Sequence, residues 1–95
     1  MGRRAHDGSS PLGRAVATPG ALKLLSEAGE DPFDYLARHA SGDWGELCAF
    51  DRRQNEIALR EGLRIFSSYE TPAGRCWIIT EADRSVTTIL LPEDY

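Results

Sequence analysis

The chain has 95 residues, of which 41% are hydrophobic and 27% charged, and its formal net charge is −4 at pH 7. This length and composition predict one soluble globular domain and exclude a two-domain or fibrous protein. The longest apolar run, Ile89 to Leu91, is far too short to span a membrane, and no apolar stretch follows the N-terminal arginines as a secretory signal requires. We therefore expect a cytoplasmic protein.

The acidic charge also bears on the partner. Proteins that bind nucleic acid by neutralising phosphates carry an excess of basic groups on one face. The charge of −4 therefore disfavours a conventional DNA or RNA binder, although it leaves room for a local basic cleft. Cys48 and Cys76 have no histidine at zinc-ligand spacing, so we expect no metal or other cofactor, no disulfide, and two small buried thiols.

The N-terminal part has no strong periodicity. Residues 1–11 are small, charged and poor in apolar side chains, which is typical of a mobile tail. Residues 12–95 are therefore expected to form the single domain. Within them, Leu12 to Thr18 alternates weakly, as a short extended segment or an edge strand does.

Three segments carry helix signals. Thr18 before Pro19 and Asp31 before Pro32 are typical N-caps followed by proline in the first turn. Asp51–Gln54 has the spacing of a capping box. With the glycines that follow, these signals predict helices over residues 19–28, 32–40 and 52–61.

After Gly62 the period changes to that of strands. Alternating and β-branched segments, separated by turn residues, predict strands over residues 63–70, 75–81 and 86–91. Three helices followed by three strands indicate an α+β fold, with three short helices on one face of a three-stranded antiparallel meander. The apolar faces that must meet predict a core of Leu22, Leu25, Phe33, Leu36, Leu47, Ile65, Ile78 and Ile89.

Four stretches resemble a family of small proteins from proteobacterial plasmids, integrative elements and chromosomes, whose members are labelled "plasmid-related protein". They are TPGAL (18–22), LARHASGDWGEL (36–47), NEIALREGLRI (55–65) and WIITEADRSVTTILLPEDY (77–95). The resemblance covers residues 12–95 and is most specific in the last nineteen. It implies association with mobile elements and no defined activity.

The candidate site residues lie in these stretches. His39, near a helix C-terminus where the dipole favours imidazolium, is either a general acid or base, or a cap that shields the core. Trp44, between two glycines and beside Asp43, is either a core anchor or a contact for a partner. The hairpin tip of Glu81, Asp83 and Arg84 is either a solvated turn or an ion-pair partner of residues 42–45, which we call the GDWG loop. Thr87 and Thr88 point to opposite faces of their strand.

Two functions from different classes are compatible with these residues. We favour a non-enzymatic accessory protein that binds a protein partner, such as a host restriction or defence component, through Asp43, Trp44, Glu81, Asp83 and Arg84. The alternative is a metal-independent RNase of the barnase or RelE type, in which His39 acts with Arg64 and Thr88, or with Ser67, on the sheet face. Either function predicts that His39, the GDWG loop and the Asp83–Arg84 tip share one surface patch.

Overall fold

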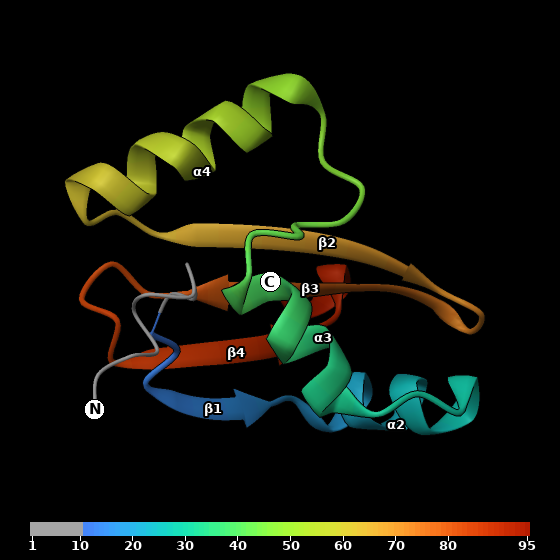
Figure 1. Ribbon diagram of the computed structural model, residues 1–95. Coiled ribbons are helices and arrows are strands. Elements are labelled where there is room, and N and C mark those ends of the chain that lie inside the picture. The colour runs from blue at the N-terminus through green and yellow to red at the C-terminus, as the bar shows by residue number, and fades with distance from the viewer. Residues whose placement is uncertain (1–10) are drawn as a thin grey trace.

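The computed structural model describes residues 11–95, which form three helices, four strands and a short C-terminal 3-10 turn (Figure 1). The predicted tail lies outside the described residues except for Pro11. In chain order the elements are β1 (Arg14–Ala17), α2 (Pro19–Ala28), α3 (Pro32–Ala40), α4 (Ala49–Glu61), β2 (Ile65–Thr71), β3 (Gly74–Thr80), β4 (Val86–Leu90) and η1 (Pro92–Asp94).

The sheet is mixed, with the strand order β1-β4-β3-β2. The predicted meander is present, since β2 pairs antiparallel with β3 and β3 with β4. However, β1 joins the other side of β4 in parallel, with Arg14 opposite Val86 and Ala17 opposite Ile89. The prediction of a purely antiparallel sheet is therefore wrong. Two parallel strands need a long connection, and here the connection from β1 to β4 contains every element between them. The two strands are therefore far apart in the sequence, and no local pattern predicts that they pair.

Local capping explains why two helices occur where the sequence places them. The Thr18 hydroxyl accepts a hydrogen bond from the amide of Ala21, and the Asp31 carboxylate accepts one from the amide of Phe33. Helix α4 begins at Ala49, earlier than predicted, with Cys48 as an N-cap that makes no side-chain bond. The capping box expected at residues 51–54 is therefore not used.

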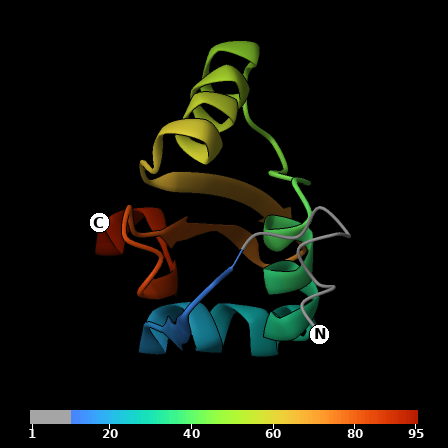
Figure 2. The same ribbon diagram turned by 60° about the vertical axis from the view of Figure 1, so that its left-hand side comes forward.

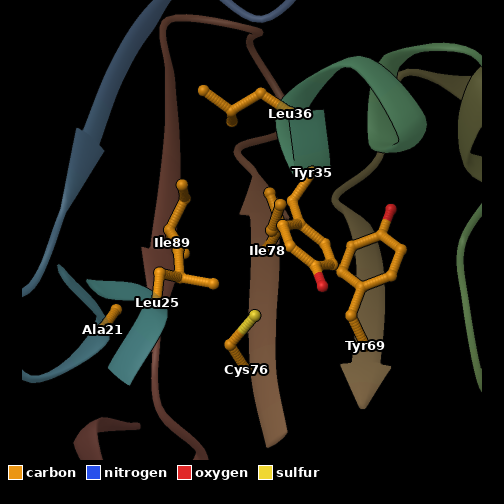
Figure 3. Close-up of a cluster of buried hydrophobic side chains, with 8 residues drawn as sticks. All are labelled: Ala21, Leu25, Tyr35, Leu36, Tyr69, Cys76, Ile78 and Ile89. Carbon is orange, nitrogen blue, oxygen red and sulfur yellow. The ribbon is translucent and has the colours of Figure 1, made fainter. Parts of the chain in front are cut away.

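The main core lies between the sheet and helices α2 and α3 (Figure 3). It contains Ala21, Leu25, Tyr35, Leu36, Tyr69, Cys76, Ile78 and Ile89. Six predicted core residues are buried, but Leu22 is 48% and Phe33 is 73% exposed, so those two predictions are wrong. Both side chains line a surface groove beside β1 instead of entering the core.

The two faces of the sheet differ in what covers them. Figure 2 shows α3 on one side of the sheet and η1 on the other, and Figure 1 shows α4 alongside β2. A second cluster of Trp44, Leu47, Ala58 and Ile65 joins α4 to the β2 edge. The expectation of three helices on one face therefore holds for α2 and α3, and α4 packs at an edge instead.

Candidate functional site

His39 lies at the centre of a buried polar chain. Its Nδ1 is 2.5 Å from the Ser67 hydroxyl, and its Nε2 is 2.9 Å from the Thr80 hydroxyl. Thr80 contacts the Thr87 hydroxyl at 2.7 Å, and Thr87 donates to the carbonyl oxygen of Leu12 at 2.7 Å. A carbonyl can only accept, so each hydroxyl must donate toward Leu12. This direction places the imidazole proton on Nε2 and leaves Nδ1 to accept from Ser67.

The environment keeps this imidazole neutral. His39 is 1% exposed, and burial lowers its pKa to about 4. The expectation that the helix dipole favours imidazolium is therefore wrong, because desolvation exceeds the dipole effect. A serine and a histidine in hydrogen-bond contact are the geometry of an activated nucleophile, but Ser67 is fully buried as well. The pair has no room for a substrate and holds α3 to the sheet.

In the RNase hypothesis His39 acts with Arg64 and Thr88, but the sheet separates His39 from the other two residues. His39 contacts Ser67 and Thr80 on the face that α3 covers. Thr88 pairs with Ile79, and Ile79 and Arg64 line a hollow on the opposite face. No observation thus favours joint catalysis by His39, Arg64 and Thr88.

The loop that contains Trp44 bonds to the outer edge of β2. Trp44 is 7% exposed and belongs to the cluster under α4, so it is a core anchor rather than a surface contact. Its carbonyl accepts from the amide of Ser68 at 3.2 Å, and the amide of Glu46 donates to the carbonyl of Ser68 at 2.7 Å. Gly45 between them has φ 74°, and a Cβ there would lie 2.1 Å from the oxygen of Ser68.

Two further side chains also bond to the outer edge of β2, and neither was predicted from the sequence. The Asn55 amide donates to the carbonyl of Phe66 at 2.7 Å and accepts from its amide at 3.1 Å. The Glu46 carboxylate accepts from the amide of Glu70 at 2.9 Å. An asparagine inside an otherwise regular helix pattern was the available signal, since asparagine is a weak helix former.

Asp43 is engaged within the domain. Its carboxylate pairs with Arg38, with 2.7 Å between Nε and Oδ2, and this partner holds the pKa of Asp43 below its usual value. Arg38 also lies over the Tyr69 ring, with Cζ 4.6 Å from the ring centroid. Tyr69 donates its hydroxyl to the carbonyl of Asp43 at 2.6 Å. The aspartate therefore holds the loop that carries Trp44.

The hairpin tip is also internally satisfied. Arg84 donates to four carbonyl oxygens, those of Ala58, Leu63, Glu81 and Ala82. The tip residue Asp83 accepts from the amide and hydroxyl of Ser85, as the solvated-turn alternative predicts. Among residues 11–95 no ion pair joins the tip to the GDWG loop, and Glu81 pairs with Arg64 instead. With His39 and Trp44 buried, the predicted surface patch is not formed.

The β1 edge, in contrast, is apolar. Among residues 11–95, β1 pairs only with β4, and beside it lies a groove of about 260 Å³. The exposed apolar residues Val16, Leu22 and Phe33 gather here, with exposures of 37%, 48% and 73%. The complete lining is Ala15, Val16, Ala17, Leu22, Pro32, Phe33, Leu36 and Ile89, which we call the β1 groove.

No family model, curated protein or solved structure matches this chain. The resemblance to the plasmid-related family therefore stays a prediction, and the geometry alone must support a function. Within residues 11–95, no helix combines the length and apolar character needed to cross a membrane. In the same part of the chain, no cluster of three potential ligand side chains is placed to hold a metal ion. Cys76 is buried, which raises its pKa to about 11, whereas Cys48 is exposed, contrary to prediction.

Proposed function

We propose that this protein binds an extended segment of a protein partner, which adds as a strand beside β1 and places its apolar side chains in the β1 groove. The observation that carries this proposal is the contrast between the two edges of the sheet. The β2 edge is closed by backbone bonds from residues 44–46 and by the side chains of Asn55 and Glu46. The β1 edge has an apolar groove and no strand partner among the described residues.

An open edge strand is a liability, because its free backbone groups template unwanted pairing. Proteins usually protect such edges, and this chain uses three separate devices to do so at β2. Among the described residues no such device covers β1, which lies next to exposed Leu22 and Phe33, and this arrangement is expected of a strand that takes a partner.

The register of β1 shows which of its backbone groups do not bond to β4. The amides of Arg14 and Thr18 donate to the carbonyl oxygens of Ser85 and Ile89, so the backbone groups of the even-numbered residues are directed toward β4. In a parallel ladder the alternate residues, Ala15 and Ala17, then direct their backbone groups outward. Their methyl side chains are small, so an added strand can approach the edge closely.

Charge near the groove indicates the chemistry of the partner. Asp31 and Asp34 flank the groove residues Pro32 and Phe33 in the chain, and both carboxylates are exposed. The proposed segment therefore alternates apolar residues with Lys or Arg, which would meet these carboxylates. A host restriction or defence component with a basic surface, as proposed from the sequence, is a partner of this kind.

The test is a peptide selection. A displayed library of extended peptides is selected on the wild-type protein and then compared on two variants, Phe33→Asp and Phe50→Asp. Phe50, at 65% exposure on α4, is the matched control for Phe33 because it is similarly exposed and far along the chain from the groove. We expect the selection to enrich basic peptides with high β-propensity. Their affinity should be at least tenfold weaker for the Phe33→Asp variant than for wild type, and unchanged for the Phe50→Asp variant.

Two-dimensional NMR then locates the bound peptide. The largest amide shifts should fall on Ala15 and Ala17. Equal binding to both variants, or shifts confined to another surface, would refute the proposal. Concentration-dependent dimerisation that Phe33→Asp abolishes would assign the groove to a second copy of this chain and would also refute it.

A further inference from the structure

The sheet face opposite α3 carries a hollow of about 240 Å³. It is lined by Arg64, Phe66, Trp77, Ile79 and Tyr95, and we call it the aromatic hollow. The rings of Phe66 and Trp77 stand at 88° with centroids 5.0 Å apart, and those of Trp77 and Tyr95 at 68° and 5.9 Å. A flat ligand ring can therefore stack on one of these rings while meeting the edge of another.

Of the described residues that line the aromatic hollow, Arg64 alone has a charged side chain. Its guanidinium donates to the Tyr95 hydroxyl at 2.9 Å and lies 3.3 Å from the carboxylate of Glu81. The side chains of Arg64 and Glu81 are 50% and 39% exposed. Exposed ion pairs of this kind contribute little stability, so an anionic ligand can replace Glu81 as the partner of Arg64.

Charged residues of both signs surround the hollow. The strand register places Arg14 and Arg75 on the same face as Trp77, together with Glu70. Glu81 lies beside Arg64, and η1, which carries Glu93 and Asp94, is on this side of the sheet as well. The Arg64 guanidinium in the lining, and not an excess of positive charge on the face, is therefore the group that would attract an anion.

We propose that the aromatic hollow binds a planar heteroaromatic ring that carries a phosphate, the chemistry of a nucleotide. The ring stacks against Trp77 or Tyr95, and the Arg64 guanidinium donates two hydrogen bonds to the phosphate. The volume is below the roughly 300–1,000 Å³ of pockets for drug-sized ligands, which favours a single ring system. This inference is independent of the β1 groove.

Such a group has two sources, a free nucleotide or one unit of a single-stranded nucleic acid. Arg75 distinguishes them. It lies on the same face but does not line the hollow, and it pairs with Glu70 at 2.7 Å and with the Ser68 hydroxyl at 2.7 Å. A strand that passes over the face would reach Arg75, whereas a mononucleotide in the hollow would not.

The test is calorimetric titration of the full chain with a mononucleotide, with the matching nucleoside and with a short single-stranded oligonucleotide. Arg64→Gln should weaken binding of the mononucleotide by about tenfold or more and leave that of the nucleoside unchanged. Tyr95→Ala should weaken both, since Tyr95 is 72% exposed and its loss leaves the core intact. Circular dichroism of each variant checks the fold.

Arg75→Gln is the matched control, because it removes the same charge from the same face. Arg75→Gln should leave the affinity for the mononucleotide unchanged. If it weakens binding of the oligonucleotide alone, the natural ligand is a single-stranded nucleic acid rather than a free nucleotide. Glu81→Gln should tighten binding of the mononucleotide by removing the competing carboxylate. Three results would each overturn the proposal: no binding of either phosphate-bearing probe at millimolar concentration, equal mononucleotide losses for Arg64→Gln and Arg75→Gln, or weaker mononucleotide binding by Glu81→Gln.

Discussion

The side chain of Asn55 in α4 pairs with both backbone groups of Phe66 in β2, as a neighbouring strand would. It donates to the carbonyl oxygen at 2.7 Å and accepts from the amide nitrogen at 3.1 Å. One buried amide, 3% exposed, thus replaces a strand partner at the edge of the sheet. The same contact therefore holds α4 against the sheet and protects the edge of β2.

Asn55→Ala should lower the free energy of unfolding by about 2 kcal/mol, because it leaves two partly buried backbone groups of Phe66 without partners. Urea denaturation monitored by circular dichroism measures this change. The exposed neighbour Gln54 supplies the control, and Gln54→Ala should stay within about 0.5 kcal/mol of wild type. Similar values for the two variants would show that the Asn55 bonds do not hold the edge.

The neutral His39 predicts a dependence of stability on pH. Its pKa is about 4 in the folded protein and 6.5 as a model value, so the unfolded chain binds the proton more readily between these values. Stability should therefore fall as pH decreases from about 6.5 toward 4, by up to about 3 kcal/mol, and should not change through this group at higher pH.

His39→Gln isolates this effect, because glutamine cannot be protonated in that range. The variant should be less stable than wild type at pH 7, and the difference should shrink as pH falls toward 4. Parallel curves for the two proteins, obtained by denaturation at several pH values, would contradict a neutral buried imidazole.

Gly45→Ala should destabilise the fold more than Gly42→Ala. Both glycines have positive φ, 74° and 91°, so both substitutions introduce backbone strain of about 1 kcal/mol. Only at Gly45 would the new Cβ meet the carbonyl oxygen of Ser68, while at Gly42 no atom lies within 4 Å. The loop must then move from β2, which hydrogen exchange of the Ser68 amide would detect. Equal decreases in melting temperature for the two variants would refute the close approach of Gly45 to the Ser68 carbonyl.

Arg84 is expected to act in stability rather than in partner binding. Arg84→Ala should cost about 2 kcal/mol, because carbonyls at the end of α4 and at the tip lose their donor. Arg84→Gly should cost less than Arg84→Ala, since Arg84 has φ 62° and glycine adopts that backbone conformation without strain. Thermal denaturation compares the two, and a smaller effect of alanine would contradict this account.

Leu36→Ala should cost about 2 to 4 kcal/mol, since Leu36 is 6% exposed in the main core. Leu22→Ala removes the same atoms from a side chain that is 48% exposed, and should cost much less. A thermal shift of Leu36→Ala no larger than that of Leu22→Ala would mean that α3 is peripheral to the core.

Local sequence signals determined much of this fold. The N-caps Thr18 and Asp31, with proline after each, define α2 and α3 at their observed bounds, because capping involves residues within one helical turn. Alternation and turn residues likewise predict the β2–β3–β4 meander, whose strands are neighbours along the chain.

Only the tertiary structure decided the parallel pairing of β1 with β4 and the roles of the candidate residues. His39 and Arg84 are conspicuous in the sequence because they are chemically versatile, yet their partners, such as Ser67 and Ala58, lie more than twenty positions away. Burial and hydrogen bonding across such separations depend on how the elements pack. The same packing leaves Phe33 exposed at the β1 groove and gathers Trp77 with Tyr95 on the opposite face.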